Sequence, residues 1–396
     1  MTPDLTDEID VGALRADTPS CAGVIHLNNA GASPSPDPVH QTVTAHLELE
    51  RRIGGYAAAA EAAEGLVAFY DEAAGMLNAA PDEIAFVENA TRAWDMAFHA
   101  LPWKEGDRVL THGAAEYASN MLAFLQMAQR RGIVVDQVLS DETGQVDVAA
   151  LEAMIGPRTR LIALTHVPTH CGLVNPAEAV GAVARSHGIP YQLDACQSAG
   201  QIPLDVQRIG CDMLSATGRK FLRGPRGTGF LYVRRDFAET LDPPMIDLVA
   251  ARWSGSKRFD LAPGARRFET FERHVAGQIG LGRAIRYARA VGIHKIAHRV
   301  GNLANHLRVR LLETPGVSLH DPGAVRCGIV SFRCRGEPVD ITVARLAERR
   351  IMASVSRIEM ARTDFEANGL EALVHLSVHS FNTESEINQA VDVVRR

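Results

Sequence analysis

Short apolar runs alternate with helical patterns through the middle of this 396-residue chain, between about residues 84 and 234. Apolar runs of four to eight residues bounded by turns are typical of buried strands. Strands that alternate with helices predict a mostly parallel sheet with helices on both faces, which is an α/β fold. Seven runs are predicted strands: 84–87, 108–111, 133–139, 161–167, 190–194, 213–216 and 229–233.

The rest of the chain predicts a second, smaller unit. Residues 277–300 have the pattern of one long helix, and the alanine-rich run 56–77 predicts another. Beyond residue 300, two predicted strands (328–332 and 374–380) and two predicted helices (340–350 and 383–394) form an α+β unit. We therefore expect a large domain at 25–275, and a small domain made of 1–24 and 276–396 with the long helix as connection.

Composition excludes several classes of partner. The net charge is −6 and no basic run suits nucleic acid. No run of about 18 apolar residues predicts a membrane span. The first ten residues are acidic and lack the apolar stretch of a signal peptide. The six cysteines are scattered without a CxxC pair, which favours a reducing compartment. A cytoplasmic enzyme is expected.

Lys220 follows one predicted strand in a polar turn, and Asp194 ends the strand before it. A carboxylate at the end of a buried strand is costly unless a cation pairs with it. Pyridoxal phosphate (PLP) needs both groups: a lysine binds its aldehyde as a Schiff base, and an aspartate keeps its pyridine nitrogen protonated, so that the ring accepts electrons. The pair predicts a PLP enzyme; a surface lysine and a helix N-cap aspartate are the alternatives.

Other polar residues near these strand ends suit the remainder of the cofactor. Ala90 and Thr91 open a predicted helix, where backbone amides can hold a phosphate. Thr217 and Arg219 stand beside Lys220 and can complete the phosphate site. Gln197 can reach the phenolic oxygen of the ring. Tyr117 can stack on the ring, or alternatively belong to the core. Arg219 as a plain surface charge is the remaining alternative.

The order Asp194, Gln197, Lys220 resembles the class V aminotransferase-fold enzymes, which include cysteine desulfurases, selenocysteine lyases, isopenicillin N epimerases and kynureninases. The resemblance extends over nearly the whole chain, from Ile25 to Ile387. It implies the PLP-dependent transferase fold of type I, with Lys220 as the internal aldimine lysine and general acid/base. It also implies a homodimer with shared active sites, in which the segment 267–269 reaches toward the partner's phosphate.

The same resemblance implies residues that contact the substrate. Thr169 takes a position that is often asparagine, and Asn29 lies in the matching N-terminal stretch. The run 54–63 is similar to C–S lyases that act on S-substituted cysteines, including hercynylcysteine sulfoxide lyases, which would place Tyr56 near the substrate.

Two departures from the family pattern bear on the reaction. Cysteine desulfurases carry a nucleophilic cysteine before the last strand, and the corresponding residues 351–363 contain none. We therefore expect that this chain is not a cysteine desulfurase. His375 stands where the family places an arginine that binds the substrate carboxylate, and histidine offers one donor and is often neutral at pH 7. Either Arg357 or Arg362 replaces that contact, or the carboxylate is held weakly; a core histidine is the alternative.

The predicted reaction is C–S β-elimination from an S-substituted cysteine, which yields pyruvate and ammonia. Transamination, epimerisation and decarboxylation start from the same carbanion and are alternatives. A non-catalytic PLP-fold scaffold is an alternative of another class. A metal site built on His166, His170 and Cys171 is disfavoured because a second ligand pair at useful spacing is missing, so no metal is expected.

Overall fold

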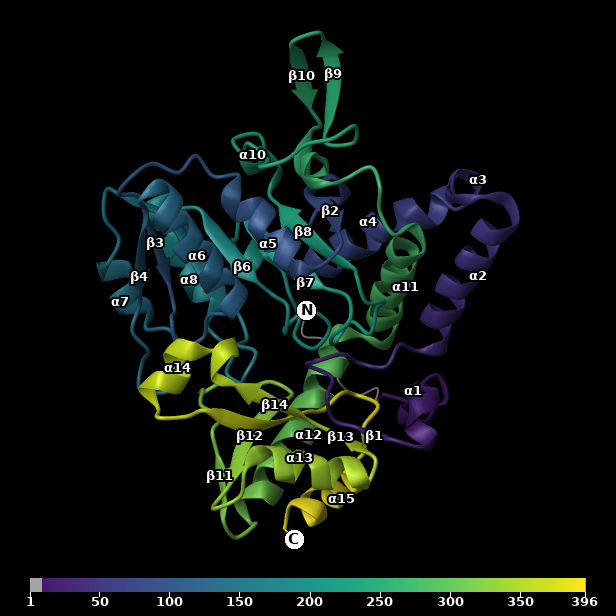
Figure 1. The fold of residues 1–396 in the computed structure, drawn as a ribbon, viewed down its shortest axis with the longest axis vertical. Helices are drawn as coiled ribbons and strands as arrows, with labels where there is room; N and C mark the ends of the chain where they lie inside the picture. The colour runs from purple at the N-terminus through teal and green to yellow at the C-terminus, as the bar shows by residue number, and fades with distance from the viewer. Residues whose placement is uncertain (1–8, 396) are drawn as a thin grey trace.

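A computed structural model describes residues 9–395 and has a seven-stranded sheet at its centre (Figure 1). The strand order is β2-β8-β7-β6-β5-β3-β4, and neighbours from β7 to β4 are parallel. β8 is antiparallel to both of its neighbours because residues 218–228 return the chain without a helical crossover. The predicted mainly parallel α/β sheet is therefore confirmed. The strands are β2 Ile84–Val87, β3 Arg108–Thr111, β4 Val134–Gln137, β5 Thr159–Thr165, β6 Tyr191–Asp194, β7 Met213–Thr217 and β8 Gly229–Val233.

Helices cover both faces of this sheet, so the inner strands β6, β7 and β8 are buried along their whole length. Along β8, Phe230 and Tyr232 enter one core and Leu231 and Val233 enter the other. One core includes α4 (Ala63–Leu77), α8 (Ala177–His187) and α11 (Val275–Val291). The other includes α5 (Ala90–His99) and α6 (Ala118–Arg131). This two-sided burial is the physical reason that the strands were recognisable as continuous apolar runs.

Two predicted helices are each two helices in the structure. The long connection predicted at 277–300 divides at Gly292 into α11 and α12 (Ile293–Leu312), because Gly292 has a φ of 97°. A residue in this backbone region interrupts a helix, and glycine adopts it at the lowest cost. The run predicted at 56–77 is α3 (Gly55–Glu61) followed by α4.

Beyond α12, a four-stranded antiparallel sheet forms the smaller unit. Its order is β11-β12-β15-β14, with β11 Val317–Leu319, β12 Ile329–Cys334, β15 Ala372–Ser377 and β14 Ser354–Arg357. Its core is shared with α12, α13 (Val339–Glu348) and α15 (Glu384–Val394). Thr383 and Glu386 form a capping box at the start of α15, with hydrogen bonds of 3.1 and 3.2 Å.

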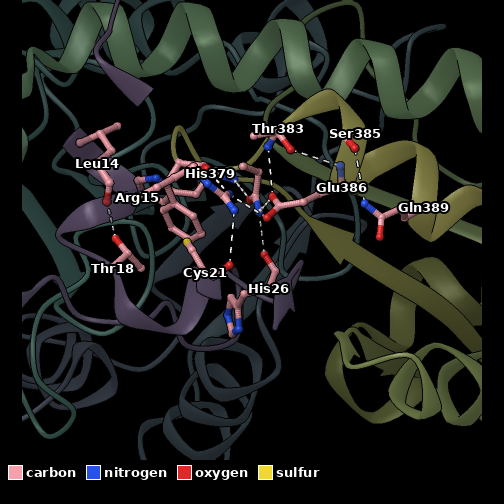
Figure 2. Close-up of polar contacts among 12 residues, drawn as sticks. Leu14, Arg15, Thr18, Cys21, His26, His379, Thr383, Ser385, Glu386 and Gln389 are labelled. Carbon is pink, nitrogen blue, oxygen red and sulfur yellow. Dashed lines mark hydrogen bonds and ion pairs between the residues drawn. The ribbon is translucent and has the colours of Figure 1, made fainter. Parts of the chain in front are cut away.

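The N-terminal segment packs against this smaller unit (Figure 2). β1 (Ile25–His26) pairs in parallel with β13 (Ile351–Met352). Arg15, in α1 (Val11–Ala16), donates hydrogen bonds to Glu386 at 2.7 Å and to the carbonyl of Phe381 at 3.0 Å. The domain boundaries at 25–275 stay a prediction, and residues 25–28 contact the C-terminal unit.

A hairpin that the sequence analysis did not predict projects from the large unit, at the top of Figure 1. It consists of β9 (Ala251–Gly255) and β10 (Arg258–Leu261). Trp253 and Phe259 on it are 76% and 52% exposed. The remaining helices are α2 Asp37–Ile53, α7 Val148–Ala153, α9 Val206–Ile209, α10 Arg235–Ala238 and α14 Arg362–Ala367, with 3-10 turns at Pro19–Ala22, Pro81–Glu83, Gly264–Phe268 and Ile358–Met360. Within residues 9–395, no helix has both the length and the apolar character required to span a bilayer.

Candidate active site

A cavity of about 440 Å³ lies at the carboxyl ends of β5, β6 and β7. In open α/β sheets, ligands bind at this edge. All the residues predicted to hold the cofactor line the cavity, as does Thr169. The complete lining is Asn89, Ala90, Thr91, Tyr117, Thr165, Val167, Thr169, Asp194, Cys196, Gln197, Thr217, Arg219 and Lys220.

Lys220 is buried in this cavity, just beyond the end of β7. Burial lowers the pKa of its amine, and the neighbouring guanidinium of Arg219 lowers it further, whereas Cys196 and Asp194 act in the opposite direction. A lowered pKa increases the fraction of neutral amine, which is the nucleophilic and basic form. Arg219 also donates a hydrogen bond to the carbonyl of Gly31.

Asp194 is buried at the end of β6, and donors already hold both of its carboxylate oxygens. Oδ1 accepts the backbone N–H of Cys196 at 2.9 Å, and Oδ2 accepts Nδ2 of Asn120 at 3.0 Å. Hydrogen bonds to a carboxylate favour its charged form. A fixed negative charge in the cavity that contains Lys220 is the arrangement that a pyridinium ring requires.

The start of α5 forms another wall of the cavity. Asn89 is the N-cap of this helix, and its side chain accepts the N–H of Arg92 at 2.9 Å. The first-turn amides of Ala90 and Thr91 have no acceptor within the helix, so they are available to an anion. Gly229 lets β8 approach this turn, since a Cβ there would lie 3.0 Å from the carbonyl carbon of Asn89 and 3.2 Å from the amide nitrogen of Ala90. Thr217 lines the same cavity and adds a hydroxyl.

Gln197 contains a polar atom without a partner. Its Oε1 is buried and makes no hydrogen bond in the described structure, while Nε2 donates to Thr169 Oγ1 at 3.4 Å and to the carbonyl of Ala30 at 3.3 Å. A buried unpartnered oxygen in a cavity wall is the expected mark of a missing ligand. Tyr117, the N-cap residue of α6, is half-buried at the same cavity rather than in the core.

Four residues predicted to contact the substrate do not line the cavity: Asn29, Tyr56, Arg357 and His375. Asn29 is fully buried, and its amide bonds to the carbonyl of Ser377 at 2.8 Å, so it joins the N-terminal segment to β15. Tyr56 is 80% exposed and lines a separate hollow with Phe271. Arg357 is exposed and pairs with Asp340 at 2.6 Å. Strand and helix geometry, which sequence spacing does not specify, turns these side chains elsewhere.

The alternative arginine, Arg362, is also exposed and pairs with Glu366 at 2.9 Å. His375 is buried in β15, where Nδ1 lies 3.2 Å from Ser354 Oγ and Nε2 has no hydrogen-bond partner among residues 9–395. Burial lowers the pKa of His375 to about 4, and the nearby charges of His170 and Lys220 contribute. The imidazole at this position is therefore neutral.

Residues 9–395 hold no group of three or more histidine, cysteine or acidic side chains able to bind a metal. His166 lies 3.0 Å from Ser198 Oγ, and His170 lies 3.1 Å from Asp364.

Sequence reasoning missed four residues of the site: Glu116, Asn120, Thr165 and Cys196. Asn120 and Glu116 contact Asp194 or its neighbours, and the other two line the cavity. Burial raises the pKa of the Cys196 thiol. The one signal for these residues in the sequence was Glu116, an acidic residue that follows the predicted strand 108–111.

Comparison with known proteins identifies the family. The model of the class V aminotransferases matches residues 25–390. The chain belongs to the class V aminotransferase family. A probable cysteine desulfurase of Methanothermobacter thermautotrophicus is 28% identical, covering 94% of each chain. The apo structure of the cysteine desulfurase from Thermococcus onnurineus NA1 superposes with a TM-score of 0.91 at 26% identity, covering 98% of each chain. The cystine C–S lyase C-DES, in complex with its product cysteine persulfide, superposes with a TM-score of 0.85 at 25% identity, covering 95% of this chain and 98% of the other.

Membership of the class V family makes this chain a PLP-dependent enzyme that acts on amino acids, and it confirms the predicted fold and cofactor. The predicted exclusion of cysteine desulfurase is wrong, because class V relatives across nearly the whole chain carry that name. The exclusion depended on a missing cysteine in one stretch. The fold places another thiol, Cys196, in the cavity wall, and residue spacing alone does not show which cysteine reaches the site.

Proposed function

We propose that this class V enzyme breaks the C–S bond of a sulfur-bearing amino acid by β-elimination. The observation that carries the proposal is the presence of Lys220 and Asp194 in one cavity, with the phosphate-binding start of α5 in its wall. The structural likeness to a cystine C–S lyase supports this reaction.

PLP, when bound, supplies an electron sink for the carbanion at the substrate Cα. The amine of Lys220, with its lowered pKa, takes the proton from Cα. Asp194 holds a proton at the ring nitrogen, and Asn120 and the Cys196 amide keep its carboxylate in place. The sulfur leaves Cβ with the electron pair of the C–S bond, and hydrolysis of the remaining fragment gives pyruvate and ammonia.

For the substrate side, we propose Thr169 and His375 as contacts. Thr169 lines the cavity, and the unpartnered Nε2 of His375 offers a hydrogen bond close to Lys220. Arg357 and Arg362 are paired with acidic residues at the surface. A neutral imidazole in place of a guanidinium predicts weak binding of simple amino acid carboxylates.

Cysteine desulfurase activity is the second candidate, and the names of the relatives favour it. In that reaction an enzyme thiol takes the sulfur and the carbon skeleton leaves as alanine. Transamination, epimerisation and decarboxylation release other products again. The non-catalytic scaffold has no support, since the family membership makes the chain an enzyme.

Product analysis separates these reactions. The holoenzyme is incubated with cystine, cysteine and S-alkyl cysteines, and pyruvate, alanine, ammonia, sulfide and carbon dioxide are measured. The proposal predicts pyruvate and ammonia in equal amounts. Alanine without pyruvate would establish the desulfurase reaction instead, and an absence of both with every sulfur compound would refute C–S cleavage.

We further propose a cytoplasmic homodimer. The six free cysteines suit a reducing compartment. The exposed Trp253 and Phe259 of the β9–β10 hairpin supply apolar surface for a second copy. Sedimentation of the purified protein at micromolar concentration tests the dimer, and a monomer at that concentration would contradict it.

A further inference from the structure

Behind Asp194 lies a buried carboxylate that the reaction does not use. Glu116 follows β3 and is buried, and four donors from the surrounding elements point at it. Oε2 accepts the hydroxyl of Thr111 at 2.6 Å. Oε1 accepts the hydroxyl of Thr165 at 2.5 Å, Nδ2 of Asn120 at 2.7 Å and the backbone N–H of Tyr117 at 3.0 Å.

Asn120 connects this carboxylate to the cofactor site. Its Nδ2 donates to Glu116 Oε1 and also to Asp194 Oδ2, at 2.7 and 3.0 Å. An amide NH₂ has two hydrogens, so one can serve each carboxylate. The orientation of the Asn120 amide, and with it the hydrogen bond to Asp194, is therefore fixed by Glu116. The same Glu116 oxygen also holds the backbone of Tyr117, which lines the cavity.

We propose that Glu116 is the positioning residue of the PLP site. Acting through Asn120, it orients the Asp194 carboxylate toward the ring nitrogen, and through the backbone of Tyr117 it sets the aromatic side chain against the ring. This role depends on the presence of the cofactor and not on which amino acid reacts. The role of Glu116 and the proposed C–S cleavage can therefore be tested, and refuted, independently of each other.

Two variants separate the role of Glu116 as a hydrogen-bond acceptor from the role of its negative charge. In Glu116→Gln, the amide oxygen can keep the three contacts of Oε1, and the Thr111 hydroxyl can reverse to accept from the new NH₂. In Glu116→Leu, all four donors lose their acceptor. Positioning therefore predicts that glutamine preserves the site and leucine disrupts it.

The test measures the cofactor in the holoenzyme, by dialysis against defined PLP concentrations and by the pH midpoint of its visible absorption band. We expect Glu116→Leu to weaken PLP binding about tenfold or more, the effect of losing one hydrogen bond to a charged group. We also expect it to shift the pH midpoint, because Asp194 no longer fixes the proton on the ring nitrogen. Glu116→Gln should keep the PLP dissociation constant within about twofold of the wild-type value and should leave the pH midpoint unchanged.

Glu386 is a matched control. It is a buried glutamate that accepts donors from Arg15, Asn382 and the Thr383 backbone, but it lies in the smaller unit (Figure 2). Glu386→Leu should lower the melting temperature and leave the pH midpoint unchanged. Wild-type values for Glu116→Leu would overturn the proposal, as would a Glu116→Gln variant as impaired as Glu116→Leu. If Glu116→Leu does not fold, Asn120→Ala decides, and a wild-type dissociation constant and pH midpoint in that variant would overturn it.

Discussion

Burial and the nearby charged groups act on the pKa of the Lys220 amine in different directions. Burial and Arg219 lower the pKa of its amine, while the acidic Asp194 and the Cys196 thiol limit that shift. Titratable groups whose pKa is shifted by burial and by a specific charged neighbour cluster at functional sites. The lowered pKa of the Lys220 amine comes from the cavity around it, and a lysine at the surface would not have it.

Replacing this lysine gives the first prediction. Lys220→Ala should bind PLP without a covalent bond and lose turnover, because no amine remains to bind the aldehyde or take the Cα proton. Mass spectrometry after borohydride reduction checks this, since only wild type should retain the mass of the cofactor. Lys104→Ala, at an exposed position, serves as control and should behave as wild type.

His375 gives the second prediction at this scale. His375→Arg should bind simple α-amino acids more tightly, by about tenfold or more, because a guanidinium offers a charged pair of donors to the carboxylate. Titration of the cofactor absorbance with alanine measures the affinity. An unchanged dissociation constant would show that position 375 does not face the carboxylate.

At the scale of elements, Gly292 separates α11 from α12 with a φ of 97°. Gly292→Ala should destabilise the protein by about 1 kcal/mol or more, since alanine is strained in this backbone region. Gly301, inside α12, has no such φ and nothing within 4 Å of an added Cβ. Gly301→Ala should stabilise the protein by about 0.5–1 kcal/mol through helix propensity. Urea unfolding of both variants measures the difference, and equal signs would contradict the argument.

The sequence predicted those elements whose burial leaves a repeated pattern. The strands β5 to β8 are apolar on both faces, and the capping box of α15 is a local signal. The buried face of α6 is harder to place from the sequence: Phe124 is buried, its apolar neighbour Leu125 is 51% exposed, and the buried face runs through Ala123 and Met127. A pattern of period 3.6 places a face only to within about one residue.

Long-range side-chain contacts limit how many residues of the site can be predicted from the sequence. Lys220 and Asp194 were predictable because a βα unit brings successive strand ends together. Asn120 and Glu116 were not, because their contacts join β3, β5, β6 and α6 through side chains. The β9–β10 hairpin was missed because its apolar residues stand singly among polar ones.

Within residues 9–395, burial lowers the pKa of four buried histidines strongly: His112, His166 and His375 to about 4, and His379 to about 3. In the unfolded chain the pKa of histidine is about 6.5. Below that pH these histidines bind protons in the unfolded chain, whereas in the folded protein they stay neutral until the pH reaches their lowered pKa values. The free energy of unfolding should therefore fall between about pH 6.5 and 4, by about 1 kcal/mol per pH unit for each histidine.

His379→Gln tests this dependence. The ring of His379 lies between Phe221 and Phe381, and Nε2 lies 3.0 Å from the carbonyl of Phe221. Glutamine keeps a donor but does not titrate. In urea unfolding at pH 7 and pH 5, the variant should lose less stability than wild type, by the contribution of one of the four histidines, about 1 kcal/mol per pH unit. Parallel curves for variant and wild type would show that His379 is not responsible.

Because β1 pairs with β13, and Arg15 with Glu386, these contacts of residues 11–28 join positions far apart in the sequence. During translation, residues 11–28 leave the ribosome before residues 351–386, and more than three hundred residues are added in between. At about 5–20 residues per second, this interval lasts roughly 20–70 s. Leu14 and Leu27, both buried in the finished protein, remain uncovered during that time. Nascent chains of this enzyme therefore offer residues 11–28 as a binding site to chaperones until residues 351–386 have emerged.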